Sequence, residues 1–130
     1  MNNYSKDVLL ADDDPDDVYL FSRALGDINN AHKLLVAGDS SELFAVLQKE
    51  KPHIIFLDYF FPPGTGLSCV AEIRKNQAYD DIPVVVHATS LPDKIAQECI
   101  EKGAASFIQK SVTYKGMVDN IKSMMDLHCR

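Results

Sequence analysis

The chain has 130 residues, of which 46% are hydrophobic and 25% charged, the composition of an ordinary globular protein. We expect one domain over residues 1–130, with its core at about 6–127 and no second, output domain. A net charge of −6 argues against the basic patch by which proteins bind nucleic acid. No apolar run approaches the roughly 20 residues of a membrane span. Three cysteines, an odd number, argue against a disulfide framework, and we expect a cytoplasmic protein.

Strands and helices are predicted to alternate along the chain. Five runs rich in Val, Ile and Leu predict strands at residues 8–11, 33–37, 53–57, 84–87 and 106–109. After each run, apolar residues recur at steps of three and four, which predicts a helix. Strands that are apolar throughout indicate a sheet covered on both faces. The sequence therefore predicts an α/β domain with a doubly wound, five-stranded parallel sheet.

Capping residues predict where the helices begin and end. Asp14, Asp39 and Ser90 are expected to accept hydrogen bonds from free backbone N–H groups at the starts of the first, second and fourth helices. Gly26 and Gly103 stand where the ends of the first and fourth helices would favour a residue of positive φ.

Small or charged residues follow four of the five predicted strands. Ligands bind at the carboxyl ends of the strands in such a sheet, so these residues are expected to gather at one edge. They are Asp12 and Asp13 after the first strand, Asp58 after the third, Ala88 and Thr89 after the fourth, and Lys110 after the fifth.

The acidic run DDDPDD contains two kinds of residue. Helix capping and the favourable charge at a helix N-terminus account for Asp14, Asp16 and Asp17. Asp12 and Asp13 precede the cap, at the end of a strand that should be buried. Neither capping nor helix charge explains that pair.

Asp58 ends the apolar run HIIFLD and is followed by YFFPPGTGL, which predicts a tight loop. Carboxylates about 4 Å apart repel by roughly 4 kcal/mol per pair at an effective dielectric constant of about 20, so Asp12, Asp13 and Asp58 together need a cation. Oxygen ligands without nearby His or Cys favour Mg²⁺. Lys110 would supply a positive charge matched to these carboxylates and to a phosphoryl oxygen.

Four segments, VLLADDDPDD, IIFLDYFFPPGTGL, IPVVVHATS and KGAASFIQK, occur in the order and at the separations of one known family. With them the whole chain resembles the receiver domains of two-component response regulators, such as the single-domain chemotaxis regulator. The resemblance implies a flavodoxin-like (βα)5 fold with strand order 2-1-3-4-5.

The resemblance also implies roles for individual residues. Asp58 would be the phosphoryl acceptor and Lys110 would contact the phosphoryl group. Asp13 would bind Mg²⁺ directly, Asp12 would hold it through water, and Phe60 would offer its backbone carbonyl.

Two positions depart from the family pattern near the switch. Ala88 replaces the usual hydroxyl residue, and Thr89 could substitute only if it pointed to the same face, although neighbouring strand residues point to opposite faces. Ser111 replaces a proline that often follows a cis bond, so either the loop differs or strain is stored there. Phe107 occupies the aromatic switch position, and we expect its movement to be weakly coupled to phosphorylation.

The sequence therefore predicts a signal carrier rather than a turnover enzyme. It would take a phosphoryl group from a sensor histidine kinase or phosphotransfer protein and relay the signal to a downstream protein. A non-switching module that only binds proteins is the alternative, motivated by Ala88 and Ser111. An aspartyl-phosphate hydrolase would need a second Asp where this chain has Phe60.

Overall fold

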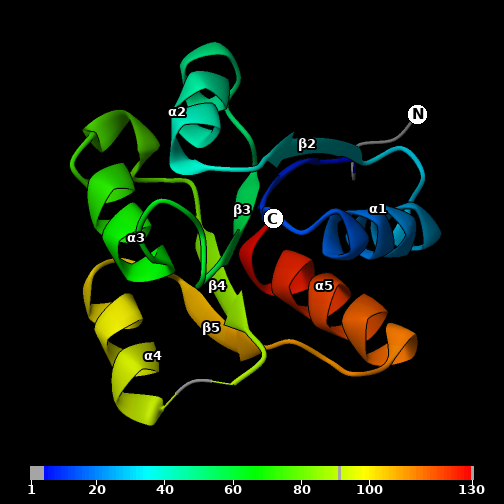
Figure 1. Cartoon of the computed structure of the whole chain (residues 1–130). Coiled ribbons are helices and arrows are strands. Elements are labelled where there is room, and N and C mark those ends of the chain that lie inside the picture. The colour runs from blue at the N-terminus through cyan, green and yellow to red at the C-terminus, as the bar shows by residue number, and fades with distance from the viewer. Residues whose placement is uncertain (1–4, 91, 130) are drawn as a thin grey trace.

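Five parallel strands form one sheet, and helices cover both of its faces (Figure 1). The computed structural model describes residues 5–90 and 92–129. The elements in chain order are β1 (Asp7–Ala11), α1 (Pro15–Ile28), β2 (Lys33–Ala37), α2 (Ser40–Lys49), β3 (Ile54–Asp58), α3 (Gly66–Arg74), the short 3-10 helix η1 (Gln77–Tyr79), β4 (Val84–Ala88), α4 (Asp93–Glu101), β5 (Ser106–Gln109) and α5 (Tyr114–His128). The strand order β2-β1-β3-β4-β5 confirms the predicted doubly wound, flavodoxin-like topology.

The core consists of two apolar layers, one on each side of the sheet. Helices α1 and α5 cover one face, and α2, α3 and α4 cover the other (Figure 1). Successive strand residues point to opposite faces, so β3 contributes Phe56 to the α1/α5 side and Leu57 to the α3/α4 side. All residues of β3 and β4 are buried, as expected for central strands of a parallel sheet.

The carboxyl edge of the sheet lies one residue further along β3 and β4 than predicted. Asp58 and Ala88 are the last residues of these strands, not the first residues after them. Both are therefore held by the sheet itself. Asp58 pairs in register with His87 of β4.

Two of the three predicted N-terminal caps are confirmed. The Asp14 side chain accepts a hydrogen bond from the Asp16 N–H at 2.9 Å, and the Asp39 side chain accepts one from the Glu42 N–H at 2.8 Å. The prediction for Ser90 is wrong, because α4 begins after Pro92, which has no side-chain acceptor to cap it. The charge of Asp93 in the first turn still favours this helix start.

The prediction that α1 ends at Gly26 is also wrong. The helix continues to Ile28, and Asn29 is its C-cap. Packing of Leu25 and Ile28 in the α1/α5 layer offsets the helix penalty of a glycine, which is about 1 kcal/mol. Gly103, in contrast, has a φ of 118° and is the one positive-φ residue in the described part of the chain.

The loop after β3 is tight but shorter than predicted, because α3 already begins at Gly66. A side chain at Gly66 would come within 2.9 Å of the Tyr59 Cα, so only glycine lets the helix start so close to the strand end. Within residues 5–90 and 92–129 the Pro62–Pro63 bond is cis and the Lys110–Ser111 bond is trans. The loop at Ser111 therefore differs from the proline pattern.

No helix in the described part of the chain is long and apolar enough to cross a membrane. Cys69, Cys99 and Cys129 are all free thiols.

Candidate functional site

The ends of β1 and β3 place two carboxylates side by side at the carboxyl edge of the sheet. Ala11 and Leu57 are paired in register, so Asp12 and Asp58, the residues that follow them, are neighbours. The two residues are only 2% and 8% exposed. The Asp12 carboxylate accepts a hydrogen bond from the Asp14 N–H at 2.9 Å, and the Asp58 carboxylate accepts one from the Phe60 N–H at 3.1 Å. Backbone donors therefore fix one oxygen of each.

Lys110 brings the charge of the fifth strand to the same place. Its backbone N–H donates to the Ala88 carbonyl at 2.8 Å, which fixes the chain just beyond β5. Its Nζ lies 3.2 Å from Asp58 Oδ2 and 3.5 Å from Asp12 Oδ2. The predicted convergence of Asp12, Asp58 and Lys110 on one pocket is thus observed.

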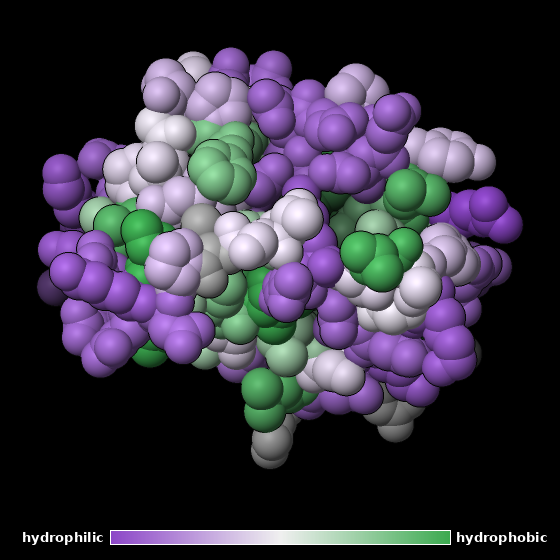
Figure 2. Space-filling model, turned by 60° about the horizontal axis from the view of Figure 1, so that its bottom comes forward, coloured by the Kyte–Doolittle hydropathy of each residue, from purple (hydrophilic) through white to green (hydrophobic). Residues whose placement is uncertain are grey.

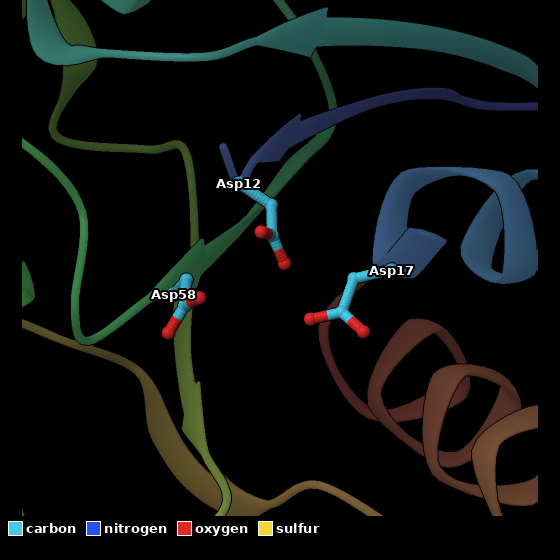
Figure 3. Close-up of side chains that lie close together, drawn as sticks. All are labelled: Asp12, Asp17 and Asp58. Atoms are coloured by element: carbon cyan, nitrogen blue, oxygen red, sulfur yellow. The ribbon is translucent and has the colours of Figure 1, made fainter. Parts of the chain in front are cut away.

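Asp17 is a third carboxylate of this pocket, and the sequence analysis missed it. Its Oδ2 lies 3.0 Å from Lys110 Nζ. Figure 3 shows its carboxylate projecting from α1 toward those of Asp12 and Asp58. The assignment of Asp17 to helix capping alone is therefore wrong. Helical spacing could have found it, because Asp17 lies four residues before Phe21 and eight before Leu25, on the buried stripe of α1.

Asp13 lies outside this group of carboxylates. Its side chain is exposed, at a surface groove that also involves Pro15 of α1 and Asp39 before α2. The structure thus brings together Asp12, Asp17 and Asp58, but not Asp13, and the direct metal contact of Asp13 remains a prediction.

The charges in the pocket perturb one another. Burial raises the pKa of the Asp12 carboxyl to about 6, although the Asp14 N–H and the Lys110 ammonium lower it. Burial lowers the pKa of Lys110, but the hydrogen bond to Asp17 and the charges of Asp12 and Asp58 outweigh this and raise it. Three carboxylates therefore share one permanent positive charge.

This donor set fits a hard divalent cation. One carboxylate oxygen from each of Asp12, Asp17 and Asp58 lies within 4.8 Å of the other two. All three ligands are oxygens, as Mg²⁺, Ca²⁺ and Mn²⁺ prefer. A dication would also neutralise the charge that Lys110 leaves uncompensated.

The predicted switch residues Ala88 and Phe107 lie on the same side of the sheet, and Thr89 lies on the other. Ala88 is buried in the apolar layer on the α3/α4 side, and Phe107 is half-buried against that layer. Thr89 is exposed, and lines a cavity on the other side of the sheet with Asp17 and Lys110. Thr89 therefore does not place its hydroxyl on the Ala88 side of the sheet.

The cavity beside the pocket has a volume of about 250 Å³ and lies between the sheet, α1 and α5. Its walls are mostly apolar, and His87 of β4 lines it, in edge contact with Phe56 at a ring distance of 6.4 Å. His87 is 8% exposed, and its Nε2 has no hydrogen-bond partner among the residues that the structure describes. Burial and the nearby Lys110 charge lower the pKa of His87 to about 3, so the ring is neutral.

The family model of the response regulator receiver domain matches residues 8–122 of the chain. The chain belongs to this family. The receiver domain is 30% identical over 132 residues to the response regulator Rcp1 of Synechocystis sp., a match that covers 94% of this chain and 90% of Rcp1. It is 27% identical over 96 residues to the phosphate regulon transcriptional regulatory protein PhoB of Escherichia coli, where it covers only 42% of the relative's length.

Solved structures have the same fold. The phosphorylated cyanobacterial phytochrome response regulator RcpA is 24% identical, with a TM-score of 0.85 and 95% and 94% of the two chains covered. The Mn²⁺-bound form of Rcp1 is 26% identical, with a TM-score of 0.81 and 93% and 92% covered. Receiver domains bind divalent metal, and the carboxylate cluster of this one fits such an ion.

Proposed function

We propose that this receiver domain accepts a phosphoryl group on Asp58 from a sensor histidine kinase or phosphotransfer protein. The observation that carries the proposal is the position of Asp58, whose Oδ2 lies 3.2 Å from Lys110 Nζ at the carboxyl end of a central strand. A nearly buried carboxylate beside a cation is costly to maintain without a use.

The chemistry follows from these groups. An Asp58 carboxylate oxygen attacks the phosphorus of a phosphohistidine, a P–O bond forms, and the P–N bond breaks as the imidazole nitrogen keeps the electron pair and takes up a proton. The Lys110 ammonium stabilises the negative charge on the equatorial phosphoryl oxygens.

We propose Mg²⁺ as the divalent ion, which would neutralise charge on the transferred group when bound. Asp12 (through water), Asp13, Asp58 and the Phe60 carbonyl would hold it. The clustering of Asp12 with Asp58 supports this set, and the exposed Asp13 side chain would have to turn inward.

The domain would act in the cytoplasm as a signal carrier rather than a turnover enzyme, and relay its state to a downstream protein by contact. Free thiols and the acidic net charge are consistent with this role. Large apolar side chains are exposed near the pocket, with Phe60 63% and Val112 98% accessible. Figure 2 shows green apolar groups dispersed among purple polar ones on one face, as suits a transient partner.

The second candidate is a protein-binding module that no longer switches. Ala88 favours it, because its side chain has no hydroxyl to bind a phosphoryl oxygen. In that case phosphorylation would be absent, or would leave the surface around α4 and β5 unchanged.

Incubation with acetyl phosphate and Mg²⁺ tests the proposal. Intact-mass spectrometry should show a gain of one phosphoryl group in the wild-type chain and none in Asp58→Asn. Absence of the gain in the wild type would favour the binding module.

A further inference from the structure

The carboxylate oxygen closest to the Lys110 ammonium belongs to Asp17, not to the acceptor. The Nζ–Oδ2 distances are 3.0 Å to Asp17, 3.2 Å to Asp58 and 3.5 Å to Asp12. An ammonium group has three N–H donors, so these three carboxylates occupy all of them. A phosphoryl oxygen on Asp58 can be bound by Lys110 only if one of these contacts is given up.

The three carboxylates differ in what they lose when the ammonium leaves. The Asp12 side chain is 1% exposed, so loss of the Lys110 contact would leave a buried carboxylate without this cation, and water could not replace it. The Asp17 side chain is 36% exposed, and water can replace the lysine there. Asp58 carries the phosphoryl group itself. Asp17 is therefore the partner that Lys110 can release at least cost.

Helix capping does not account for the direction in which Asp17 points. The N-cap of α1 is Asp14, which accepts from the Asp16 N–H. Asp16 stands in the same first turn with the same charge, but it is exposed and makes no ion pair with Lys110 in the described structure. Of these two acids it is Asp17 whose carboxylate projects from α1 toward the pocket, and its Oδ2 pairs with Lys110.

We propose that Asp17 is a positioning residue, which holds the Lys110 ammonium on the α1 side of the pocket and competes for it with the phosphoryl group on Asp58. This inference rests on the proposed function. Asp17 keeps the Lys110 ammonium close to Asp58, but its ion pair with Lys110 stabilises the unphosphorylated form. Its negative charge also opposes a second anion at Asp58. Both effects slow the transfer.

The test compares Asp17→Asn with Asp16→Asn, which removes the same charge from the same turn. At saturating Mg²⁺, the rate constant of phosphorylation by acetyl phosphate should rise about three- to fivefold in Asp17→Asn, the range expected for a partly exposed ion pair. It should stay within about twofold of wild type in Asp16→Asn, since mutations at exposed positions without such a contact have small effects. Asp17→Glu, which keeps the charge, should return the rate toward the wild-type value.

A rate in Asp17→Asn that equals the Asp16→Asn rate, or falls below wild type, would overturn the proposal. The pair itself is tested without phosphorylation by urea unfolding of Asp17→Asn, Lys110→Met and the double variant. The effect of Asp17→Asn should be largely lost when Lys110 is already Met. Additive effects would show that the two side chains are not coupled. If wild type is not phosphorylated but the coupling is present, the proposed function fails and the ion pair stands.

Discussion

The two sides of the sheet differ sharply at the carboxyl edge. On the α1/α5 side, Asp17, His87 and Lys110 place charged and polar groups in the otherwise mostly apolar wall of one cavity. On the α3/α4 side, Ala88, whose side chain has no hydroxyl, lies in an apolar layer against which Phe107 packs. The groups that we propose accept a phosphoryl group are thus present, whereas Ala88 has no hydroxyl through which a phosphoryl group could act on Phe107. Under the proposed function, acceptance of the phosphoryl group and its readout at Phe107 would be separable in this receiver domain.

Loss of Lys110 should have the largest effect on the polar side. Lys110→Met should slow phosphorylation by acetyl phosphate about 100-fold, the usual effect of removing one charge-stabilising donor. Lys115→Met is the control, since Lys115 is exposed on α5 and pairs with Asp119. Stopped-flow or quenched mass measurements give both rates, and a similar change in the two variants would contradict a role in transfer.

Replacement of Asp13 tests which acids hold the cation. If Asp13 turns inward to bind Mg²⁺, Asp13→Asn should raise the half-saturating Mg²⁺ concentration about tenfold, equivalent to about 1.4 kcal/mol. Asp16→Asn should change it little, as Asp16 is exposed in the first turn of α1. An unchanged requirement in Asp13→Asn together with a raised one in Asp17→Asn would transfer the ligand role to Asp17.

Removal of the unpartnered His87 Nε2 on the α1/α5 side should stabilise the fold. His87→Leu should raise the free energy of unfolding by about 1 kcal/mol at pH 7, because an apolar group replaces a buried polar atom without a partner. The half-buried His32, whose Nδ1 accepts from the Lys6 N–H, is the control, and His32→Leu should destabilise. Urea unfolding measures both, and a loss of stability in His87→Leu would indicate a hidden hydrogen bond.

The same residue gives a pH dependence of known sign. The pKa of His87 is about 3 in the folded state against an ordinary value of 6.5. As the pH falls, the unfolded chain therefore binds this proton before the folded chain does. The contribution of His87 to the free energy of unfolding is complete above pH 6.5 and is lost between pH 6.5 and pH 3. The slope is at most about 1.4 kcal/mol per pH unit. In His87→Leu the free energy of unfolding should fall less steeply with pH over this window. The same pH profile in wild type and His87→Leu would show that the pKa of His87 is not lowered by folding.

The smallest effect is expected from restoring the hydroxyl on the apolar side. Ala88→Ser should change the phosphorylation rate by less than about fivefold, since Lys110 and the carboxylates remain in place. It should, however, increase the change in the NMR signals of the Phe107 ring on addition of beryllofluoride and Mg²⁺. An equally large Phe107 response in the wild type would show that readout does not need this hydroxyl.

The fold could be predicted closely because its signals are local and repeated. Apolar runs placed all five strands to within one residue at each end, since buried central strands tolerate little else. The errors at Gly26 and Ser90 arose where packing or a proline overrode a capping rule. The capping residues at a helix end carry no information about the apolar layer against which the helix packs.

The residues of the site that lie at strand ends could be predicted from the sequence, whereas those on a helix or in a loop could not. Asp12, Asp58 and Lys110 lie at the carboxyl ends of strands, so the topology alone brings them to one edge. Asp17 belongs to a helix, and its inward direction depends on the rotation of α1 about its axis, which Phe21 and Leu25 fix by packing. Asp13 lies in the loop between β1 and α1, and its orientation depends on that loop. Spacing in the sequence does not determine either.

Phosphorylation of the wild-type chain with and without divalent metal tests the central claim most directly. Intact mass after incubation with acetyl phosphate should rise by one phosphoryl group in Mg²⁺, and stay constant in EDTA and in Asp58→Asn. A gain that survives in EDTA, or that persists when Asp58 is replaced, would contradict a metal-dependent acceptor formed by the acids and lysine at the end of the sheet.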